Sequence, residues 1–346
     1  MLIFIGMLEK FVTIICPTYN EEGYISRCFD SIIRQDYPLE RIELFFIDGR
    51  STDNTRTKVR DICEKYNFIK LLDNPYKVVP HALNIGIKQS KGDVIVRIDG
   101  HCEYPANYIS TLVRYLFELN ADNVGGVWNT LPAKNTIKCN AIAIASSNKF
   151  GVGNSKHKIG AKEIIETDTV PFGCFKKEVF ERIGLFDEEL IRNQDDEFNG
   201  RILKNGGKIY IIPELIIDYH ARDSIRKVYK MYYQYGLFKP LVNRKLGKPA
   251  TLRQFVPVLF VISLFCGFIL SFFSKFLFVI LLSFIVLYLA IAFTVSLKNA
   301  IKAKKLGVLF YLPVVFFIIH FGYGFGYLKG IYKMLAKQKF SVDINR

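Results

Sequence analysis

An aspartate and a histidine stand two residues apart directly after a short apolar run. The run 94–98 is rich in β-branched residues and is bounded by glycines, which is typical of a buried strand. Asp99 and His101 follow at its carboxyl end, where open α/β sheets bind ligands, and Gly100 lets a ligand approach the backbone. Carboxylate oxygens and imidazole nitrogens both bind divalent cations. The spacing therefore predicts a metal-binding edge.

Two other predicted strands also end in polar loops. Asn20 and Glu21 follow the strand 11–16, and Asp48 follows the strand 42–47. Strands alternate here with helical patterns, which predicts an α/β fold: a Rossmann-like, mainly parallel sheet with helices on both faces. The carboxyl ends of parallel strands lie at one edge, so we expect one crevice to collect all three loops. Such an acidic crevice suits a divalent cation shared with a nucleotide diphosphate.

Three uncharged apolar runs follow the α/β region, at 255–274, 276–297 and 306–328. Each is close to the ~20 residues with which a helix crosses a bilayer, and we expect at least the first two to cross. A third crossing would place the lysines of the carboxyl-terminal tail outside, against the positive-inside rule. The third run is therefore expected to be re-entrant or interfacial, with a full crossing as the alternative. Its His320 is a candidate contact for a lipid phosphate.

The net charge of +15 is concentrated in the second part of the chain. Residues 221–346 contain 19 Lys and Arg against 2 Asp and Glu, whereas residues 1–220 contain 28 against 30. A nucleic-acid-binding protein would need its basic patch on the folded domain, so this class is disfavoured. Basic clusters beside apolar runs instead match attraction to an anionic membrane surface.

The cysteines and the amino-terminal end both favour a cytoplasmic location for the first domain. Seven cysteines, an odd number without paired spacing, fit a reducing compartment better than a disulfide framework. The amino-terminal end shows no convincing secretory signal, because its apolar stretch is short and lacks a charged start. We therefore expect a multi-pass protein of the cell inner membrane whose first domain lies in the cytoplasm.

Four short motifs occur in a specific order: CPTYNEE at 16–22, IDGRSTDNT at 47–55, ALNIG at 82–86, and KGD at 91–93 leading to DGH at 99–101. Together they resemble the family 2 inverting glycosyltransferases with the GT-A fold, over about residues 11–223. The apolar runs resemble those of the membrane-attached bacterial members that build surface polysaccharides, the succinoglycan-type glucosyltransferases among them.

The resemblance implies a nucleotide-sugar site. The loop 17–21 and Asp48 would hold the uracil and ribose, and Asp99 would be the first carboxylate of the DXD motif that binds Mg²⁺ or Mn²⁺. His101 stands where the family usually has a second aspartate. The alternative to metal binding is that His101 has a purely structural role or supports a metal ligand without contacting the ion. The residues expected to bind the nucleotide-sugar are Pro17, Thr18, Tyr19, Glu21, Asp48, Asn84, Asp99 and Arg222.

The segment NQDDEFNGR at 193–201 resembles the family segment with the catalytic base. The alignment places Asp195 as the carboxylate that deprotonates the acceptor hydroxyl, with Asp196 as the alternative base. Gln194 replaces a family glutamate, which removes a charge able to raise the pKa of the base. The plain alternative is capping of a solvated helix. On the acceptor side we expect Gly173, Asp196 and Gln234.

The predicted domains are a cytoplasmic GT-A catalytic domain at 1–222, an amphipathic interfacial helix and linker at 223–254, and a membrane region with a basic tail at 255–346. A helix packed on the catalytic domain is the alternative for the linker. The predicted function is transfer from a nucleotide-sugar, preferably a UDP-sugar, to a lipid-linked saccharide acceptor. The alternatives are a polyprenyl-phosphate glycosyltransferase, a processive polysaccharide synthase and an inactive membrane scaffold.

Overall fold

The computed structural model describes residues 10–249 and 251–341. Its described residues form two compact units, which are treated separately below. The first unit runs up to Asn129 and resumes at Gly160–Tyr219; the second consists of Thr130–Ile159 and the chain from His220 onward.

A nine-stranded mixed sheet organises the first unit, with strand order β3-β2-β1-β4-β8-β6-β9-β5 and β7 paired with β9. The pairs β1–β2, β1–β4 and β2–β3 are parallel, as the sequence predicted. The pairs β4–β8, β6–β8, β5–β9 and β7–β9 are antiparallel. The strands are β1 Val12–Thr18, β2 Ile42–Asp48, β3 Ile69–Asp73, β4 Val94–Arg97, β5 Cys102–Glu103, β6 Asn123–Leu131, β7 Ile165–Glu166, β8 Cys174–Lys176 and β9 Ile209–His220.

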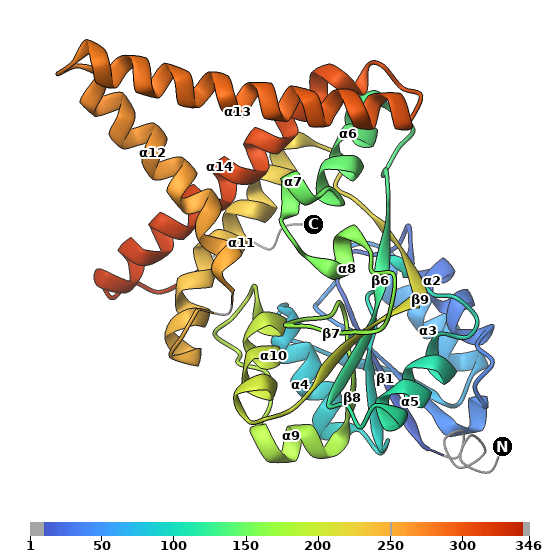
Figure 1. Ribbon diagram of the computed structural model, residues 1–346. Helices are drawn as coiled ribbons and strands as arrows, with labels where there is room; N and C mark the ends of the chain where they lie inside the picture. Colours follow the sequence, from blue (N-terminus) through green and yellow to red (C-terminus); the bar gives the residue numbers. More distant parts are fainter. Residues whose placement is uncertain (1–9, 250, 342–346) are drawn as a thin grey trace. The chain divides into compact units, whose positions relative to one another are not determined.

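Helices cover both faces of this sheet, which confirms the predicted α/β architecture (Figure 1). Alternate residues of one strand enter different cores, because successive side chains point to opposite faces. Val94 and Val96 join the core under α2, α3 and α5, whereas Ile95 joins the core under α4, α9 and α10. The helices are α2 Ile25–Ile33, η1 Leu39–Arg41, α3 Thr55–Lys65, α4 Val79–Gln89, α5 Tyr108–Glu118, α9 Lys177–Ile183 and α10 Gln194–Lys204.

The cysteines are all unpaired, as expected for a chain without a disulfide framework. Five of them are buried, and Cys266 is exposed on the helix α12, Phe255–Ser271. Burial raises the pKa of the Cys102 thiol well above its ordinary value, so this residue is a neutral, small apolar filler of the core.

The second unit is helical and includes a segment from the middle of the chain. Residues 130–159, which the sequence assigned to the first predicted domain, pack with the helices that follow His220. Buried alanines of α6 share one apolar cluster with Val228 of α11 and Phe316 of α14. The helices are α6 Ile137–Ser146, α7 Lys149–Val152, α8 Lys156–Ile159, α11 Ile225–Leu246, η2 Leu252–Gln254, α12 Phe255–Ser271, α13 Lys275–Lys302 and α14 Val308–Leu335.

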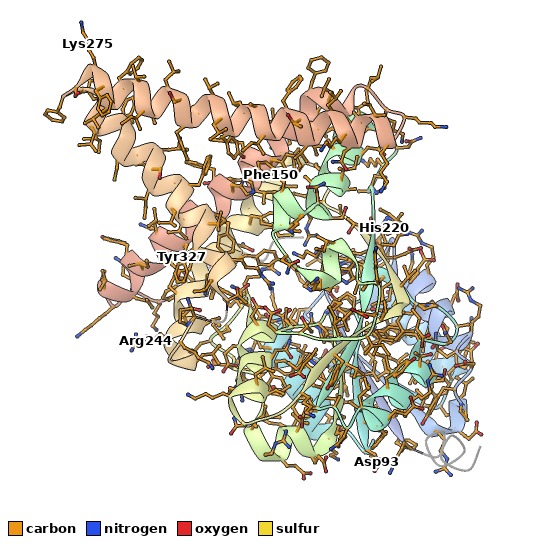
Figure 2. All side chains as sticks on the ribbon, in the orientation of Figure 1. Asp93, Phe150, His220, Arg244, Lys275 and Tyr327 are labelled. Carbon is orange, nitrogen blue, oxygen red and sulfur yellow. The ribbon has the colours of Figure 1, made fainter. Side chains whose placement is uncertain are left out.

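Three helical segments in the described part of the chain are long and apolar enough to cross a membrane: Leu252–Ser271, Lys275–Lys302 and Val308–Leu335. Most side chains of α12 and α13 are exposed, and many of these are large and apolar, as lipid-facing helices require. Figure 2 shows Lys275 where α12 and α13 meet, with its side chain directed away from both helices.

The third apolar run forms one continuous helix. α14 has 28 residues and contains Pro313 without a break, so it has no re-entrant turn. At 1.5 Å per residue it is roughly 42 Å long, more than the ~30 Å hydrocarbon core. The His320 imidazole bonds within the second unit, with Nδ1 2.9 Å from the Tyr288 hydroxyl and Nε2 2.8 Å from the Phe150 carbonyl oxygen. Both ring nitrogens therefore have protein partners, which does not support a lipid phosphate contact.

Candidate functional site

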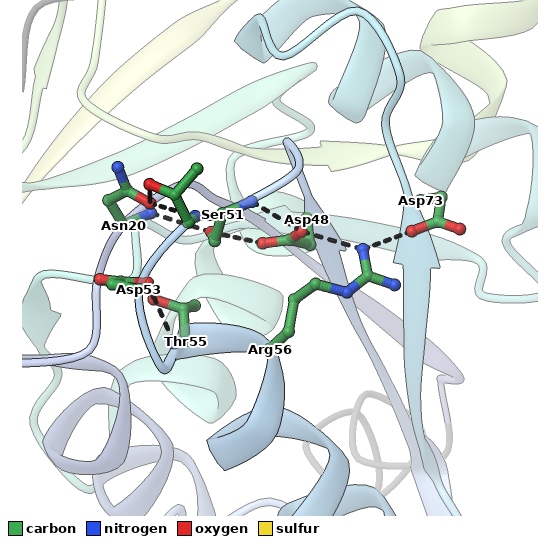
Figure 3. A network of polar contacts seen from close by, with 8 residues as sticks. Asn20, Asp48, Ser51, Asp53, Thr55, Arg56 and Asp73 are labelled. Atoms are coloured by element: carbon green, nitrogen blue, oxygen red, sulfur yellow. Dashed lines mark hydrogen bonds and ion pairs between the residues drawn. The ribbon is translucent and has the colours of Figure 1, made fainter.

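The loops after β1 and β2 are joined by hydrogen bonds at one edge of the sheet. The parallel register pairs Thr18 with Asp48, so both strands end at the same level. The Asn20 amide donates to the Ser51 hydroxyl at 2.9 Å, and the Thr52 amide donates to the Asn20 side-chain oxygen at 2.8 Å (Figure 3). Two of the three loops that the sequence predicted to line one crevice are thus fixed to each other.

Asp48 is fully buried and bound by donors of its own unit. Its carboxylate accepts hydrogen bonds from the Ser51 hydroxyl and amide, at 2.5 and 3.1 Å, and from Arg56 at 3.0 Å. Arg56 lies between Asp48 and Asp73, and its hydrogen bond to Asp73, with a second to Asp48, raises the pKa of its guanidinium (Figure 3). Asp48 therefore shapes the loop in this structure; its predicted contact with a nucleotide stays a prediction.

The last residue of β1 has a buried hydroxyl without a hydrogen bond to the described part of the chain. Thr18 Oγ1 is buried without a hydrogen-bond partner among the described residues, which costs about 1–3 kcal/mol unless a ligand supplies one. Pro17 is buried within β1, and Tyr19 is half-buried beside it. Left-handed backbone, which is unusual for residues with a side chain, occurs at Asn20 and at Arg50 in the facing loop. This edge thus has features common at binding sites.

The predicted metal ligands lie at the end of β4, as the sequence indicated. The Asp99 amide donates to the Tyr104 hydroxyl at 2.8 Å, which fixes the backbone of the turn. His101 Nδ1 is 3.2 Å from Oε1 of the buried Glu21, and its ring lies 5.9 Å from that of Tyr219. The sequence assigned Glu21 to the nucleotide-sugar; in this structure its carboxylate contacts the imidazole.

Arg97, which the sequence-based reasoning did not single out, is a buried cation beside two of the predicted site residues. Its guanidinium is 3.4 Å from the Asp99 carboxylate, and only 7% of the residue is exposed. Burial alone would lower the pKa of Arg97, but the charges of Asp99 and Asp195 more than offset this and raise it. Asp99 and Asp195 thus act on one shared positive charge.

Arg97 also has unused hydrogen-bonding capacity. Its Nε and Nη1 atoms are buried without hydrogen-bond partners within the described ranges, and the Phe172 ring lies 5.9 Å from its guanidinium carbon. The only signal in the sequence that could have drawn attention to Arg97 is a charged residue within a run of β-branched residues. Its importance depends on Asp195, a partner almost one hundred residues away, so spacing could not reveal it.

Asp195 lies in the first turn of α10, and Asp196 follows it. Asn193, in left-handed conformation with φ of 61°, turns the chain into this helix. Asp195 Oδ1 accepts a hydrogen bond from the Asp196 amide at 2.9 Å, within the first turn of the helix. The charge of Asp195 raises the pKa of Arg97; the catalytic roles predicted for Asp195 and Asp196 stay predictions.

Asn84 fixes the segment that leads to α10. Its side-chain oxygen accepts from the Phe186 amide at 3.0 Å, and its side-chain nitrogen donates to the Phe186 carbonyl and to Glu188, both at 2.9 Å. The Asn84 side chain therefore links α4 to the segment after α9. The predicted contact with a nucleotide-sugar has no support from this geometry and stays a prediction.

The residues predicted on the acceptor side are divided between the two units. Gly173 lies in the first, with φ of 86°, and a Cβ there would be 2.5 Å from the Phe175 ring. Its carbonyl accepts from the Arg97 amide at 3.0 Å, so this glycine supports the strand that bears the candidate site. Gln234 belongs to the second unit, where it is buried on α11, and so does Arg222, which was predicted to bind the nucleotide-sugar. Their predicted ligand contacts stay predictions.

The described ranges contain no group of three or more His, Cys, Asp and Glu side chains placed to hold a metal ion. Asp99 and His101 would thus supply part of a coordination shell. Such a donor pair fits an ion whose remaining ligands are diphosphate oxygens and water, the usual arrangement for Mg²⁺ and nucleotides. An oxygen and an imidazole nitrogen are also suitable donors for Mn²⁺. The residues present therefore fit the predicted cation.

Comparison with known proteins gives consistent results. The model of "Glycosyl transferase family 2" matches residues 13–184. The chain is 30% identical to the dolichyl N-acetyl-alpha-D-glucosaminyl phosphate 3-beta-D-2,3-diacetamido-2,3-dideoxy-beta-D-glucuronosyltransferase of Methanococcus voltae, over 94% of this chain and 98% of that protein. It is 28% identical to the succinoglycan biosynthesis protein ExoA of Rhizobium meliloti, over 71% of this chain and 74% of that protein.

Solved structures show the same fold at lower sequence similarity. The mannosyltransferase PcManGT of Pyrobaculum calidifontis, solved with GDP-Man and Mn²⁺, has 18% identity and a TM-score of 0.59, with coverage of 94% of this chain and 88% of that one. This likeness confirms the GT-A fold, and the family match with the full-length relative confirms the resemblance of the motifs. The chain belongs to glycosyl transferase family 2.

Proposed function

We propose that this glycosyltransferase moves a sugar, with inversion, from a nucleotide-sugar to a saccharide carried on a lipid phosphate, and that the donor is a UDP-sugar. The observation that carries the proposal is the buried Arg97 at the end of β4, 3.4 Å from the Asp99 carboxylate, whose pKa the charges of Asp99 and Asp195 raise. It links the end of β4, where a diphosphate and its cation would bind, with the start of α10, where the acceptor hydroxyl would be deprotonated.

Each carboxylate has a distinct role in this proposal. Asp195 removes the proton of the acceptor hydroxyl while that oxygen attacks the anomeric carbon from the face opposite the diphosphate. Asp99 and His101 hold Mg²⁺ or Mn²⁺, which offsets the charge that develops on the leaving diphosphate. Arg97 keeps the carboxylates of Asp99 and Asp195 compensated within a buried environment.

The lipid-linked acceptor rests on the relatives and on the apolar helices. The Methanococcus voltae relative is named for a dolichyl-linked sugar phosphate, and it aligns with nearly the whole chain. Long apolar helices in the second unit provide the means to remain at a membrane, where such acceptors reside. The excess of lysine and arginine beyond residue 220 supports a catalytic domain on the cytoplasmic side of the inner membrane.

The experiment is a transfer assay with purified full-length protein, a panel of UDP- and GDP-sugars and short lipid-linked saccharides. Asp195→Asn should lower kcat by about 10²–10⁴-fold with a nearly unchanged donor KM, because it removes the base and keeps the shape. Asp196→Asn, which changes the neighbouring carboxylate on the predicted acceptor side, should lower kcat far less than Asp195→Asn and should act mainly on the acceptor KM. Chelation should abolish transfer, and added Mn²⁺ or Mg²⁺ should restore it.

The product itself tests the stereochemistry. Nuclear magnetic resonance of the product should show an anomeric configuration opposite to that of the donor. Full activity of Asp195→Asn together with loss in Asp196→Asn would transfer the role of base to Asp196. Retention of configuration would contradict the single-displacement mechanism, and transfer confined to acceptors without a lipid would contradict the proposed acceptor.

A further inference from the structure

The imidazole of His101 is held by a carboxylate from another loop. His101 Nδ1 is 3.2 Å from Glu21 Oε1, across 80 residues of sequence. An ionised carboxylate only accepts hydrogen bonds, so Nδ1 carries the hydrogen in this contact. In the neutral ring the lone pair then belongs to Nε2, the other nitrogen.

Glu21 is itself rigidly placed. Its backbone amide donates to the Thr55 hydroxyl at 2.8 Å, and its carbonyl accepts from the amides of Tyr24 and Ile25 at 2.8 and 2.9 Å. Only 5% of its side chain is exposed, so the carboxylate is shielded from water. Its hydrogen bond to the imidazole is therefore stronger than it would be in water. The contact therefore fixes both the tautomer and the orientation of the His101 ring.

Histidines that bind metals usually have this arrangement, with the second ring nitrogen donating to a carboxylate. We propose that Glu21 is a positioning residue that holds His101 for metal binding through Nε2, and does not itself bind the nucleotide-sugar. The inference rests on the proposed function, because it presumes a cation at Asp99 and His101. It also gives a physical reason why a histidine can replace the second aspartate: the imidazole donates to the buried carboxylate, whereas an aspartate would be repelled by it.

The test measures metal binding without turnover. Binding of Mn²⁺ to the purified full-length protein with UDP is followed by electron paramagnetic resonance, and pulsed spectra report nitrogen bound directly to the ion. Glu21→Ala should weaken Mn²⁺ binding about 10–100-fold and diminish the nitrogen coupling. Glu21→Gln retains an acceptor oxygen but no charge, and its Kd should lie between those of Glu21→Ala and the parent.

Two controls separate this effect from damage to the fold. Glu22→Gln changes the adjacent carboxylate, which binds the Asn54 amide through an oxygen that Gln keeps, and should bind Mn²⁺ as the parent does. His101→Ala should remove the nitrogen coupling altogether. Thermal unfolding of every variant, without metal, shows whether the fold is retained.

The possible outcomes distinguish the two proposals. A parent protein that binds Mn²⁺ with nitrogen coupling, together with a Glu21→Ala variant of equal Kd and equal coupling, would overturn the role of Glu21 and leave the metal site standing. Mn²⁺ binding by the parent without any nitrogen coupling would overturn His101 as a ligand and this inference with it. Absence of Mn²⁺ binding by the parent would overturn the cation of the proposed function as well.

Discussion

The guanidinium of Arg97 brings together two residues that the sequence separates widely. Arg97 lies two residues after Ile95 in β4, so both side chains point to the same face of the sheet. On this face lies the core that contains residues of α10. Asp195 lies in the first turn of that helix. The buried cation at this position thus lies 3.4 Å from the Asp99 carboxylate, and the charges of Asp99 and Asp195 both raise its pKa.

Replacement of Arg97 tests this arrangement. Arg97→Lys keeps the charge but loses the planar fork, so kcat should fall at least about tenfold, while Arg97→Met should lose about 100-fold or more. The measurement is kcat and donor KM of the purified full-length protein. Arg114→Lys, which alters an exposed pair with Glu214, is the control and should match the parent. Parental kcat in Arg97→Met would disprove a role for the cation.

Individual residues also show what the sequence could predict about the site. Asp99 and His101 were found because a polar tip on a buried strand is visible locally, whereas Arg56 was not, because its two carboxylate partners come from different strands. Asp48 was identified by resemblance, yet its oxygens are occupied by Ser51 and Arg56. A motif thus indicates which residues matter, but the partners that decide the role of each depend on tertiary structure.

At the scale of elements, α10 is fixed by an arginine that the motif places at its end. Arg201 binds both oxygens of Glu197 at 2.7 and 3.0 Å, one helical turn earlier. It also donates to the carbonyl oxygens of Ile183 and Leu185, at 2.6 and 2.7 Å. These hydrogen bonds pair carbonyl oxygens at the end of α9 and in the segment after it. The Arg201 side chain therefore fixes α10, with its acidic first turn, to α9.

Removal of this arginine should destabilise the first unit. Arg201→Ala leaves the largely buried Glu197 carboxylate and two backbone carbonyls without this donor, at a cost of about 3 kcal/mol. Tm should therefore fall by roughly 6–12 °C, from about 2–4 °C per kcal/mol for a unit of this size. Thermal unfolding with Lys204→Ala, an exposed position of the same helix, provides the control. Equal Tm values in both variants would show that α10 is held by other contacts.

The elements also explain why topology was only partly predictable. β1–β4 alternate with helices and their parallel order followed from that pattern. β8 has only three residues, Cys174–Lys176, yet it lies between β4 and β6 and pairs antiparallel with both. A three-residue strand has too few positions to show periodicity, so its place in the sheet depends on long-range pairing that sequence patterns do not contain.

At the scale of the whole molecule, the chain divides into units that are not simple consecutive segments. Residues 130–159 belong with the carboxyl-terminal helices, and in the sequence they offered only a short alanine- and isoleucine-rich pattern in a basic segment. Small residues suit such packing: α6 contributes buried Ala141, Ala143 and Ala145 to the apolar cluster that it shares with α11 and α14. The sequence showed the apolar runs clearly, but not which earlier segment would pack against them.

The same use of small residues fixes α14 against α11. A Cβ added at Gly326 would lie 2.1 Å from the carbonyl oxygen of Tyr233, whereas one at Gly322 would meet its nearest atom, in the Tyr229 ring, at 3.2 Å. Backbones this close are typical of helix pairs within membranes. Gly326→Ala should therefore force the helices apart, and overpacking costs about 1–3 kcal/mol or more.

Gly322→Ala is the matched control, because it makes the same chemical change on the same helix, where the nearest atoms, in the Tyr229 ring and its carbonyl oxygen, lie at 3.2 and 3.3 Å. Thermal unfolding in detergent should show a clear loss of Tm for Gly326→Ala and a smaller change for Gly322→Ala. A mild effect on kcat is expected in both, since the first unit contains the candidate catalytic groups. Equal Tm values for the two variants would mean that the close approach of α11 and α14 does not limit the stability of the second unit.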